Sequence, residues 1–177
     1  CGLLRPGDVL MPITGKPYDT LDDVINGENI SSLKDFGIRY KEIPLDENDN
    51  IRIDEVLEYI KSNKVKVIEM QRSRGYSFRK SFSVEYLNSV IEKIKEVDSD
   101  VIIVIDNCYG EFVEKEEPKA DVLVGSLIKN MGGGIAPTGA YIVGKAEYID
   151  LIANRHTSPG VGKECGATLG FNKNILQ

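Results

Sequence analysis

The sequence predicts an α/β fold in one domain, with a mostly parallel sheet flanked by helices. Short apolar runs rich in Val and Ile recur along the chain, and such runs are typical of strands buried on both faces. Helix-like segments stand between these runs, which is the alternation that parallel strands need for their crossovers. The length of 177 residues, 41% of them hydrophobic, is enough for one sizeable core.

The chain opens with a strand and a helix. Residues 9–11 follow the turn-forming residues 6–8 and form a short apolar run, which predicts a buried strand. A second turn signal at residues 15–17 precedes a helix from Tyr18 to about Ile25. Either Asp19 or Thr20 is expected near the cap of this helix.

The next elements are a strand, a helix and another strand. Residues 39–44 predict a strand that ends at an acidic turn over 45–50. Asp54 can cap a helix over 55–62, whose apolar residues face one way. Residues 65–70 predict a third strand, followed by a basic loop over 71–76.

The second half begins with the clearest helix of the chain, capped by Ser83. Its apolar stripe at helical spacing consists of Leu87, Val90, Ile91, Ile94 and Val97. The remaining expected strands cover residues 101–105, 121–124 and 140–143. An acidic connection spans 111–118, a last helix covers 146–153, and residues 157–170 are Gly-rich and irregular.

Composition excludes several classes of function. The net charge of −6, with basic residues scattered along the chain, argues against a nucleic-acid or acidic-membrane partner. No apolar run approaches the roughly 20 residues of a membrane span, and no signal-peptide pattern opens the chain. Three cysteines are too few and too widely spaced for a disulfide framework or a zinc ribbon, so no metal is expected and a reducing cytoplasm fits best.

An acid and an amine follow two neighbouring strands. Asp106 ends the run 101–105, and Lys129 comes shortly after the run 121–124. Ligands of parallel sheets bind beyond the carboxyl ends of the strands, where both residues fall. Pyridoxal 5′-phosphate needs this pair, because an amine forms its Schiff base and a carboxylate keeps its pyridine nitrogen protonated. Taken singly, Lys129 would be read as a surface charge and Asp106 as a strand-end cap.

The surroundings of Lys129 favour a cofactor site. Ser126 offers a hydroxyl for a phosphate oxygen, and Gly132, Gly133 and Gly134 let the backbone approach a ligand closely. A Schiff-base lysine is also expected to have a depressed pKa, from desolvation beside a cationic ring. Neither nucleotide-binding glycine pattern stands between a strand and a helix here.

A resemblance to a known family is carried by three motifs, residues 106–112, 125–130 and 132–139. They resemble the PLP-dependent aluminium-resistance family of methionine γ-lyase-like and cystathionine β-lyase-like carbon–sulfur lyases. Residues 15–20, 71–76 and 159–164 are similar to that family as well. The resemblance implies the large PLP-binding domain of the aspartate-aminotransferase fold (fold type I). It also implies that residues 1–177 are an internal piece of it, without the N-terminal segment and the C-terminal small domain.

The resemblance implies roles for particular residues. Lys129 matches the Schiff-base lysine, Asp106 the partner of the pyridine nitrogen, and Ser126 a phosphate-contacting serine. Tyr18 is similar to the aromatic residue stacked on the cofactor ring, although a packing role at the helix start is an equal alternative. Ser73 lies where related enzymes contact the cofactor, and Arg74 where they contact the substrate.

Several residues keep a simpler interpretation. A solvated loop is the alternative for Arg72 and Arg74, and a surface or loop role is expected for His156. Cys108 is expected to be a small buried filler, whereas Tyr109 could either reach the cofactor or pack under its loop. Ile128 departs from the wider cystathionine-lyase pattern, which carries a hydroxyl residue beside the lysine, so one phosphate contact is absent or replaced.

The expected function is a lyase that acts on a sulfur-containing amino acid. Lys129 removes the α-proton, and a thiol leaves from the β or γ carbon. An aminotransferase or decarboxylase of the same fold, or a non-catalytic ligand-binding module, remains an alternative. The intact protein is expected to be a cytoplasmic homodimer or homotetramer, and the 177-residue piece alone to be inactive.

Overall fold

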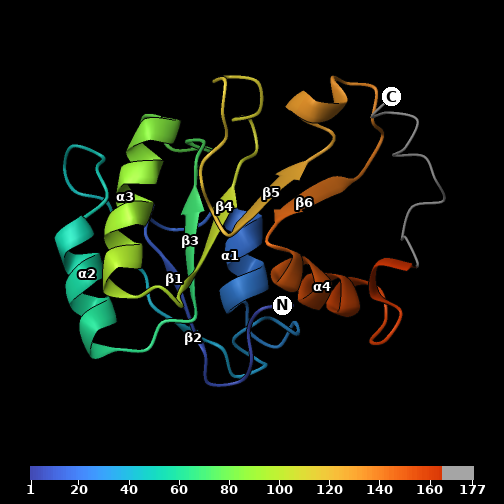
Figure 1. The fold of residues 1–177 in the computed structure, drawn as a ribbon, viewed down its shortest axis with the longest axis horizontal. Coiled ribbons are helices and arrows are strands. Elements are labelled where there is room, and N and C mark those ends of the chain that lie inside the picture. Colours follow the sequence, from blue (N-terminus) through green and yellow to red (C-terminus); the bar gives the residue numbers. More distant parts are fainter. Residues whose placement is uncertain (165–177) are drawn as a thin grey trace.

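The computed structural model describes residues 1–164. Its six strands form one sheet in the order β2-β1-β3-β4-β5-β6 (Figure 1). The strands from β2 to β5 pair in parallel with their neighbours, and β6 pairs antiparallel with β5. The strands are β1 (Val9–Pro12), β2 (Arg39–Tyr40), β3 (Val67–Gln71), β4 (Ile102–Asp106), β5 (Val122–Ser126) and β6 (Ala140–Gly144). The predicted α/β fold with a mostly parallel sheet is confirmed.

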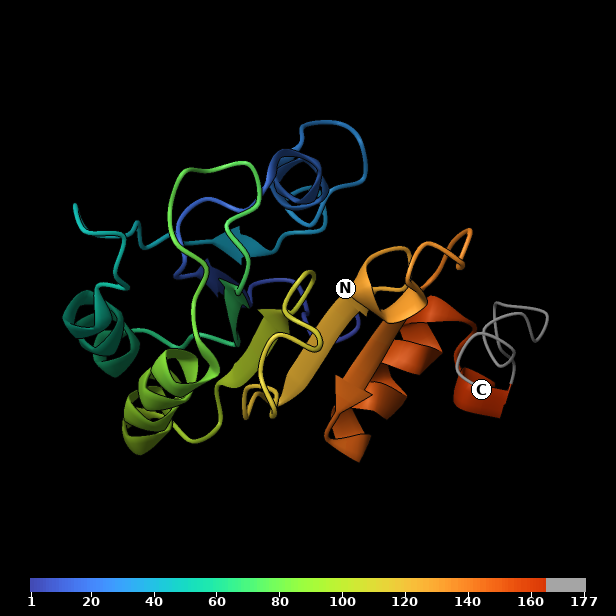
Figure 2. The ribbon, with the colours of Figure 1, turned by 90° about the horizontal axis from the view of Figure 1, so that it is seen from above.

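Helices cover both faces of the sheet (Figure 2). Helices α2 (Ile53–Ser62) and α3 (Val84–Val97) pack on one face, and α1 (Asp19–Asn26) and α4 (Ala146–His156) lie on the other. Two short 3₁₀ helices, η1 (Asn130–Gly132) and η2 (Gly162–Glu164), follow β5 and α4. This cover explains why β3 and β4 read as nearly continuous apolar runs.

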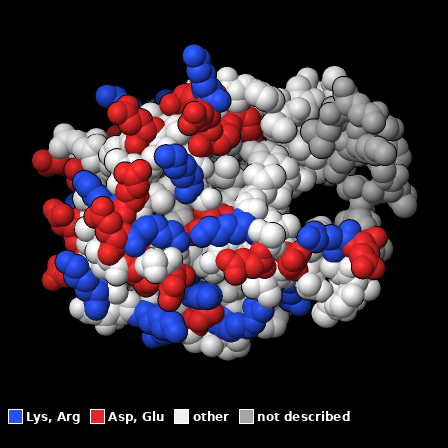
Figure 3. Space-filling view, viewed as in Figure 1, with Lys and Arg blue, Asp and Glu red and all other residues white. Residues whose placement is uncertain are grey.

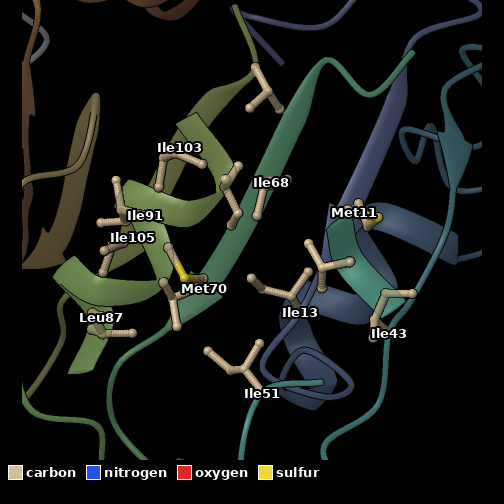
Figure 4. Packing of buried hydrophobic residues seen from close by; sticks show 14 of the residues in the cluster. Met11, Ile13, Ile43, Ile51, Ile68, Met70, Leu87, Ile91, Ile103 and Ile105 are labelled. Atoms are coloured by element: carbon tan, nitrogen blue, oxygen red, sulfur yellow. The ribbon is translucent and has the colours of Figure 1, made fainter. Parts of the chain in front are cut away.

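The larger core lies between the sheet and the α2–α3 layer. Ile68 and Met70 of β3 and Ile103 and Ile105 of β4 point to this side and are fully buried (Figure 4). Leu87 of α3 packs among them. Because side chains alternate along a strand, Val67 and Ile102, which directly precede Ile68 and Ile103, point to the other face and belong to the smaller core under α1.

Two of the three helix starts agree with the expectations from the sequence. The Ser83 hydroxyl accepts the Tyr86 N–H at 3.2 Å, so the predicted cap of α3 is confirmed. Asp19 and Thr20 lie near the cap of α1 as expected, directly after its N-cap residue Tyr18. The cap expected at Asp54 is wrong, because α2 starts after Arg52 without a side-chain cap bond. The acidic residues lie in the first turn instead, where the partial positive charge of the helix end favours them.

The predicted strand over 39–44 is shorter in the structure. Only Arg39 and Tyr40 form β2, at the edge of the sheet. The chain then stays beside β1, since the N–H groups of Lys41 and Ile43 donate to the carbonyls of Leu10 and Pro12. Pro44 lacks an N–H and cannot extend this ladder.

Acidic and basic side chains are interspersed over the face that α2 and α3 form (Figure 3). This distribution fits the absence of a basic stripe from the sequence. Within residues 1–164, none of the helices has the length and apolar character needed to cross a bilayer.

A buried aspartate, Asp121, connects the amino ends of β4 and β5. Asp121 is nearly inaccessible, accepts the Ile103 N–H at 2.8 Å, and pairs with Lys95 and Lys145 at 2.7 Å each. Burial opposes ionisation of Asp121. The Ile103 N–H and the two ammonium groups outweigh burial and lower the pKa of this carboxyl.

Asp121→Asn is therefore expected to destabilise the protein by about 2 kcal/mol, the range for a lost charged hydrogen bond whose lysine partners keep contact with water. Urea unfolding at pH 7 measures this difference. Because the pKa of Asp121 is lowered on folding, the difference should shrink as the pH falls through the folded pKa. A difference independent of pH would contradict the ion-pair explanation.

Candidate active site

The carboxyl ends of β3, β4 and β5 meet at one edge of the sheet, at the top of Figure 1. Asp106 is the last residue of β4, and Ser126 is the last residue of β5. Lys129 stands three residues beyond Ser126, immediately before η1. The sequence placed these three residues at this edge, and the parallel register puts them there.

A cavity of about 320 Å³ opens at this edge. Its lining includes Tyr18, Ser73, Asp106, Tyr109, Ser126 and Lys129. All five residues expected to bind the cofactor therefore border one cavity, whose size suits a small organic ligand. Their individual roles stay predictions.

Arg74, expected at the substrate, lies outside this lining. It borders an adjoining cavity of about 540 Å³, which shares Tyr18 and Tyr76 with the first. Tyr18 stands between the two cavities, directly before α1. An amino acid that reached from Lys129 toward Arg74 would therefore pass the Tyr18 ring.

Asp106 is held by the backbone around it. Its Oδ1 accepts the Cys108 N–H at 2.9 Å, and its carbonyl accepts the Arg72 N–H at 3.0 Å. The side chain is half-buried, which leaves a carboxylate oxygen available at the cavity. A carboxylate in such a position can hold a protonated ring nitrogen.

Lys129 is half-buried, and its Nζ lies 4.8 Å from the centre of the Tyr109 ring. The Tyr109 side chain raises the pKa of Lys129 above its ordinary value. The protein groups around Lys129 therefore do not depress this pKa, and the lowering expected from a neighbouring cationic ring stays a prediction.

The glycines after Lys129 serve two purposes. A Cβ on Gly132 would lie 1.8 Å from the Leu127 carbonyl oxygen, so only glycine fits where the chain folds back on itself. Gly133 and Gly134 have φ angles of 53° and 79°, a conformation that glycine adopts without strain. The glycines thus shape the segment that presents Lys129, as their flexibility implied.

Cys108 and Tyr109 both border the cavity. Burial, and then the charge of Asp106, raises the pKa of the Cys108 thiol to about 12, so this thiol is a poor nucleophile, as expected. Tyr109 is half-exposed beside Lys129 and does not pack under its loop. The Asp106 motif predicted the placement of this loop, but the ring position depends on a left-handed backbone at Tyr109 (φ 67°).

Glu69 was missed by the sequence analysis. It is 7% exposed on β3, and neither carboxyl oxygen has a hydrogen-bond partner within the described residues. Glu69 and Gln71 point to the same face, and Gln71 lies opposite Asp106 in the register. Burial, and then the Asp106 charge, raises the pKa of Glu69 to about 8, against the opposite effect of Arg79.

The solvated role given to Arg72 is wrong, because its side chain is 2% exposed and contacts two carboxylates.

His156 ends α4 and is exposed, as expected. Lys163 pairs with Asp150 at 2.6 Å at the surface, away from the cavity. Ile128 is half-exposed beside the cavity. Cys165 and the rest of the Gly-rich tail lie outside the described residues.

Comparisons with known proteins agree with these observations. A family model described as methionine gamma-lyase matches residues 1–177. The uncharacterized protein YnbB of Bacillus subtilis (strain 168) is 51% identical over 174 residues, covering 95% of this chain and 41% of that protein. A carbon-sulfur lyase involved in aluminum resistance from Clostridium novyi NT has a TM-score of 0.92 and 40% identity, covering 99% of this chain and 43% of that one.

A more distant likeness concerns the fold alone. A PLP-dependent aminotransferase from Streptococcus suis has a TM-score of 0.69 at 18% identity, over 99% of this chain and 44% of that one. In each comparison the chain spans about two fifths of the length of the protein it matches.

Proposed function

The chain belongs to the methionine gamma-lyase family, and we propose that the intact protein is a pyridoxal-phosphate-dependent carbon–sulfur lyase acting on a sulfur-containing amino acid. The observation that carries the proposal is the single cavity shared by the Lys129 amine, the Asp106 carboxylate and the Ser126 hydroxyl. The name of the Clostridium novyi relative supports carbon–sulfur cleavage. The likeness to a PLP-dependent aminotransferase supports fold type I and the role of this chain as the large domain.

The residues present fit the cofactor. Lys129 would hold it covalently, Asp106 would face its ring nitrogen, Ser126 would donate to its phosphate, and Tyr18 would cover its ring. Ser73 would take a further contact at the cavity wall. When bound, pyridoxal phosphate supplies an electron-poor ring that stabilises negative charge at the substrate α-carbon.

Side chains of the protein carry out the proton transfers. The Lys129 Nζ removes the α-proton as general base, and the carboxylate of Asp106 keeps a proton on the ring nitrogen. The Tyr109 contact raises the pKa of the free Lys129 amine, so this amine is charged at neutral pH and has to give up a proton before it can act as the base. A thiol then leaves from the β or γ carbon of the substrate.

The direct test incubates the full-length protein with cystathionine or methionine. Free thiol together with a 2-oxo acid and ammonia supports the lyase. A 2-oxo acid with pyridoxamine phosphate supports the alternative aminotransferase, and carbon dioxide release supports a decarboxylase. Binding without turnover supports a non-catalytic module.

Borohydride provides a second test, because it fixes the cofactor onto the amine that holds it. The adduct is expected on Lys129, and peptide mass analysis locates it. Lys145 and Lys163 serve as internal controls, since both are paired with carboxylates away from the cavity. An adduct on either of them would overturn the assignment of Lys129.

We further propose that the intact protein is a cytoplasmic homodimer or homotetramer. Large apolar side chains stand exposed around the cavities, with Tyr76 90% and Phe78 100% accessible. Exposed apolar patches of this kind mark interaction surfaces. Light scattering of the full-length protein measures its mass, and a monomer at micromolar concentration would contradict this part of the proposal.

A further inference from the structure

Arg72 is the most completely paired cation in the described part of the chain. Its Nη2 donates to Glu114 at 2.7 Å, and its Nη1 lies at 2.9 Å from Glu117. The same Nη1 donates to the Asn107 side chain at 2.8 Å and to the Gly110 carbonyl at 3.0 Å. All four partners belong to the loop that follows Asp106.

These contacts make the loop depend on a guanidinium. A buried cation is costly unless its N–H groups are satisfied, and a planar fork with five donors can satisfy several acceptors at fixed angles. Lysine offers a single ammonium and cannot reach the same set. Gly110 is adapted to the contact as well, because a Cβ there would lie 2.6 Å from Arg72 Nη1.

The loop is held in an unfavourable backbone conformation. Tyr109 and Phe112 have φ angles of 67° and 66°, where aromatic residues are rarely found. Such a conformation persists only when the surroundings enforce it. Arg72, which bonds the residues on either side of Tyr109, supplies that enforcement.

The same loop contacts the Lys129 segment at two points. The Asn130 side chain donates to the Glu111 carbonyl at 2.9 Å, and the Tyr109 ring lies beside Lys129 Nζ. A third contact reaches β6, where the Tyr141 hydroxyl donates to Glu111 at 2.7 Å. The loop therefore connects the strand end that carries Asp106 with the segment that carries Lys129.

We propose that Arg72 is a positioning residue for the reaction: by fixing loop 107–117 it sets the place of Lys129 relative to Asp106, and Asn130 transmits the constraint. The role in catalysis rests on the proposed function, whereas the mechanical connection does not. Arg72 touches neither the cavity around Lys129 nor, by this proposal, the substrate.

Hydrogen exchange of the cofactor-free protein tests the connection. Arg72→Lys is expected to speed amide exchange about tenfold in peptides covering both 107–113 and 128–133, with strands β3 and β4 unchanged. Faster exchange in 107–113 alone would overturn the proposal. Asp121→Asn is the matched control, because it breaks a buried ion pair at the opposite end of the sheet. It should leave unchanged the ratio of the exchange rates in 107–113 and 128–133 to the exchange rates in β3 and β4.

Asn130→Ala keeps the test decisive if Arg72→Lys does not fold. It removes only the bond to the Glu111 carbonyl and should speed exchange in 128–133 by several-fold; unchanged exchange there would by itself overturn the proposal. In Arg72→Lys/Asn130→Ala, exchange in 128–133 should match that of Arg72→Lys alone, because both changes cut one connection. If the two substitutions instead multiplied their effects on the exchange rate in 128–133, Arg72 would not act on the Lys129 segment through Asn130.

Cofactor attachment supplies a second measurement. Borohydride trapping at increasing pyridoxal phosphate concentration should show a maximal rate on Lys129 about tenfold lower in Arg72→Lys, with the half-saturating concentration unchanged. A changed half-saturating concentration with an unchanged maximal rate would contradict a positioning role. If the parent protein forms no adduct on Lys129, the proposed function fails, and the exchange results still decide the connection.

Discussion

Lys129→Ala is expected to abolish covalent attachment of pyridoxal phosphate and to lower lyase turnover by about 10²–10⁴-fold, the contribution of a positioned general base. The amine is both the anchor and the base in the proposed reaction, so no neighbouring group in the cavity replaces it. Absorbance of the bound cofactor in the visible and steady-state turnover with cystathionine measure the two losses.

Lys129→Arg is the matched control for this substitution. The guanidinium keeps a cation over the Tyr109 ring, so folding should be preserved, yet it cannot hold the cofactor covalently. Because Lys129 is only half-buried and forms no ion pair within the described residues, either variant should change the free energy of unfolding by less than about 1 kcal/mol. Full activity in either variant would refute the role of Lys129, and a change only in ligand binding would favour the non-catalytic module.

The free energy of unfolding of the parent protein is expected to fall as the pH rises between the two pKa values of Glu69. In Glu69→Gln the same free energy should be almost independent of pH over this range. The pKa of Glu69 lies at about 8 in the folded chain and near 4.5 as an ordinary carboxyl. Below the lower value both states carry the proton. Between the two values only the unfolded state releases it, so folding becomes less favourable with rising pH.

The size of this effect follows from the two pKa values. Their separation, at 1.36 kcal/mol for each pH unit, corresponds to about 5 kcal/mol of stability lost between pH 4.5 and pH 8. The amide of Gln has nearly the same shape and does not ionise, so the loss should vanish in Glu69→Gln. Urea unfolding at pH 5, 7 and 9 measures both slopes.

Glu92→Gln provides the reference, because Glu92 is an exposed residue of α3 and its removal should leave the slope as it is. Equal slopes in the parent protein and Glu69→Gln would mean that Glu69 is charged in the folded state.

Particular residues show how far the sequence could predict the site. Asp106 and Lys129 follow apolar runs, and the rule that parallel strands end at one edge brought them together without any knowledge of packing. The place of Ser126 at the site could be predicted from its spacing of three residues from Lys129 alone. Ser83 capped α3 as expected, because capping is a local interaction between a hydroxyl and an N–H three residues away.

Other features depended on the environment of a residue, which its neighbours in the chain do not reveal. Arg72 and Arg74 sit in the same basic loop, yet one is buried among acids and the other borders a cavity. Glu69 interrupts an apolar strand without any sign that it lacks a partner. The antiparallel pairing of β6 also followed no signal in the apolar runs.

The amino-acid sequence by itself determined the α/β class and the edge at which Asp106, Ser126 and Lys129 lie. Periodicity and strand–helix alternation are local properties, and parallel pairing turns them into a shared edge. Only the tertiary structure decided that Arg72 is buried among acidic side chains and that burial raises the pKa of Glu69. Both depend on burial and on charges far away in the chain, such as Glu117, which meets Arg72 across 45 residues.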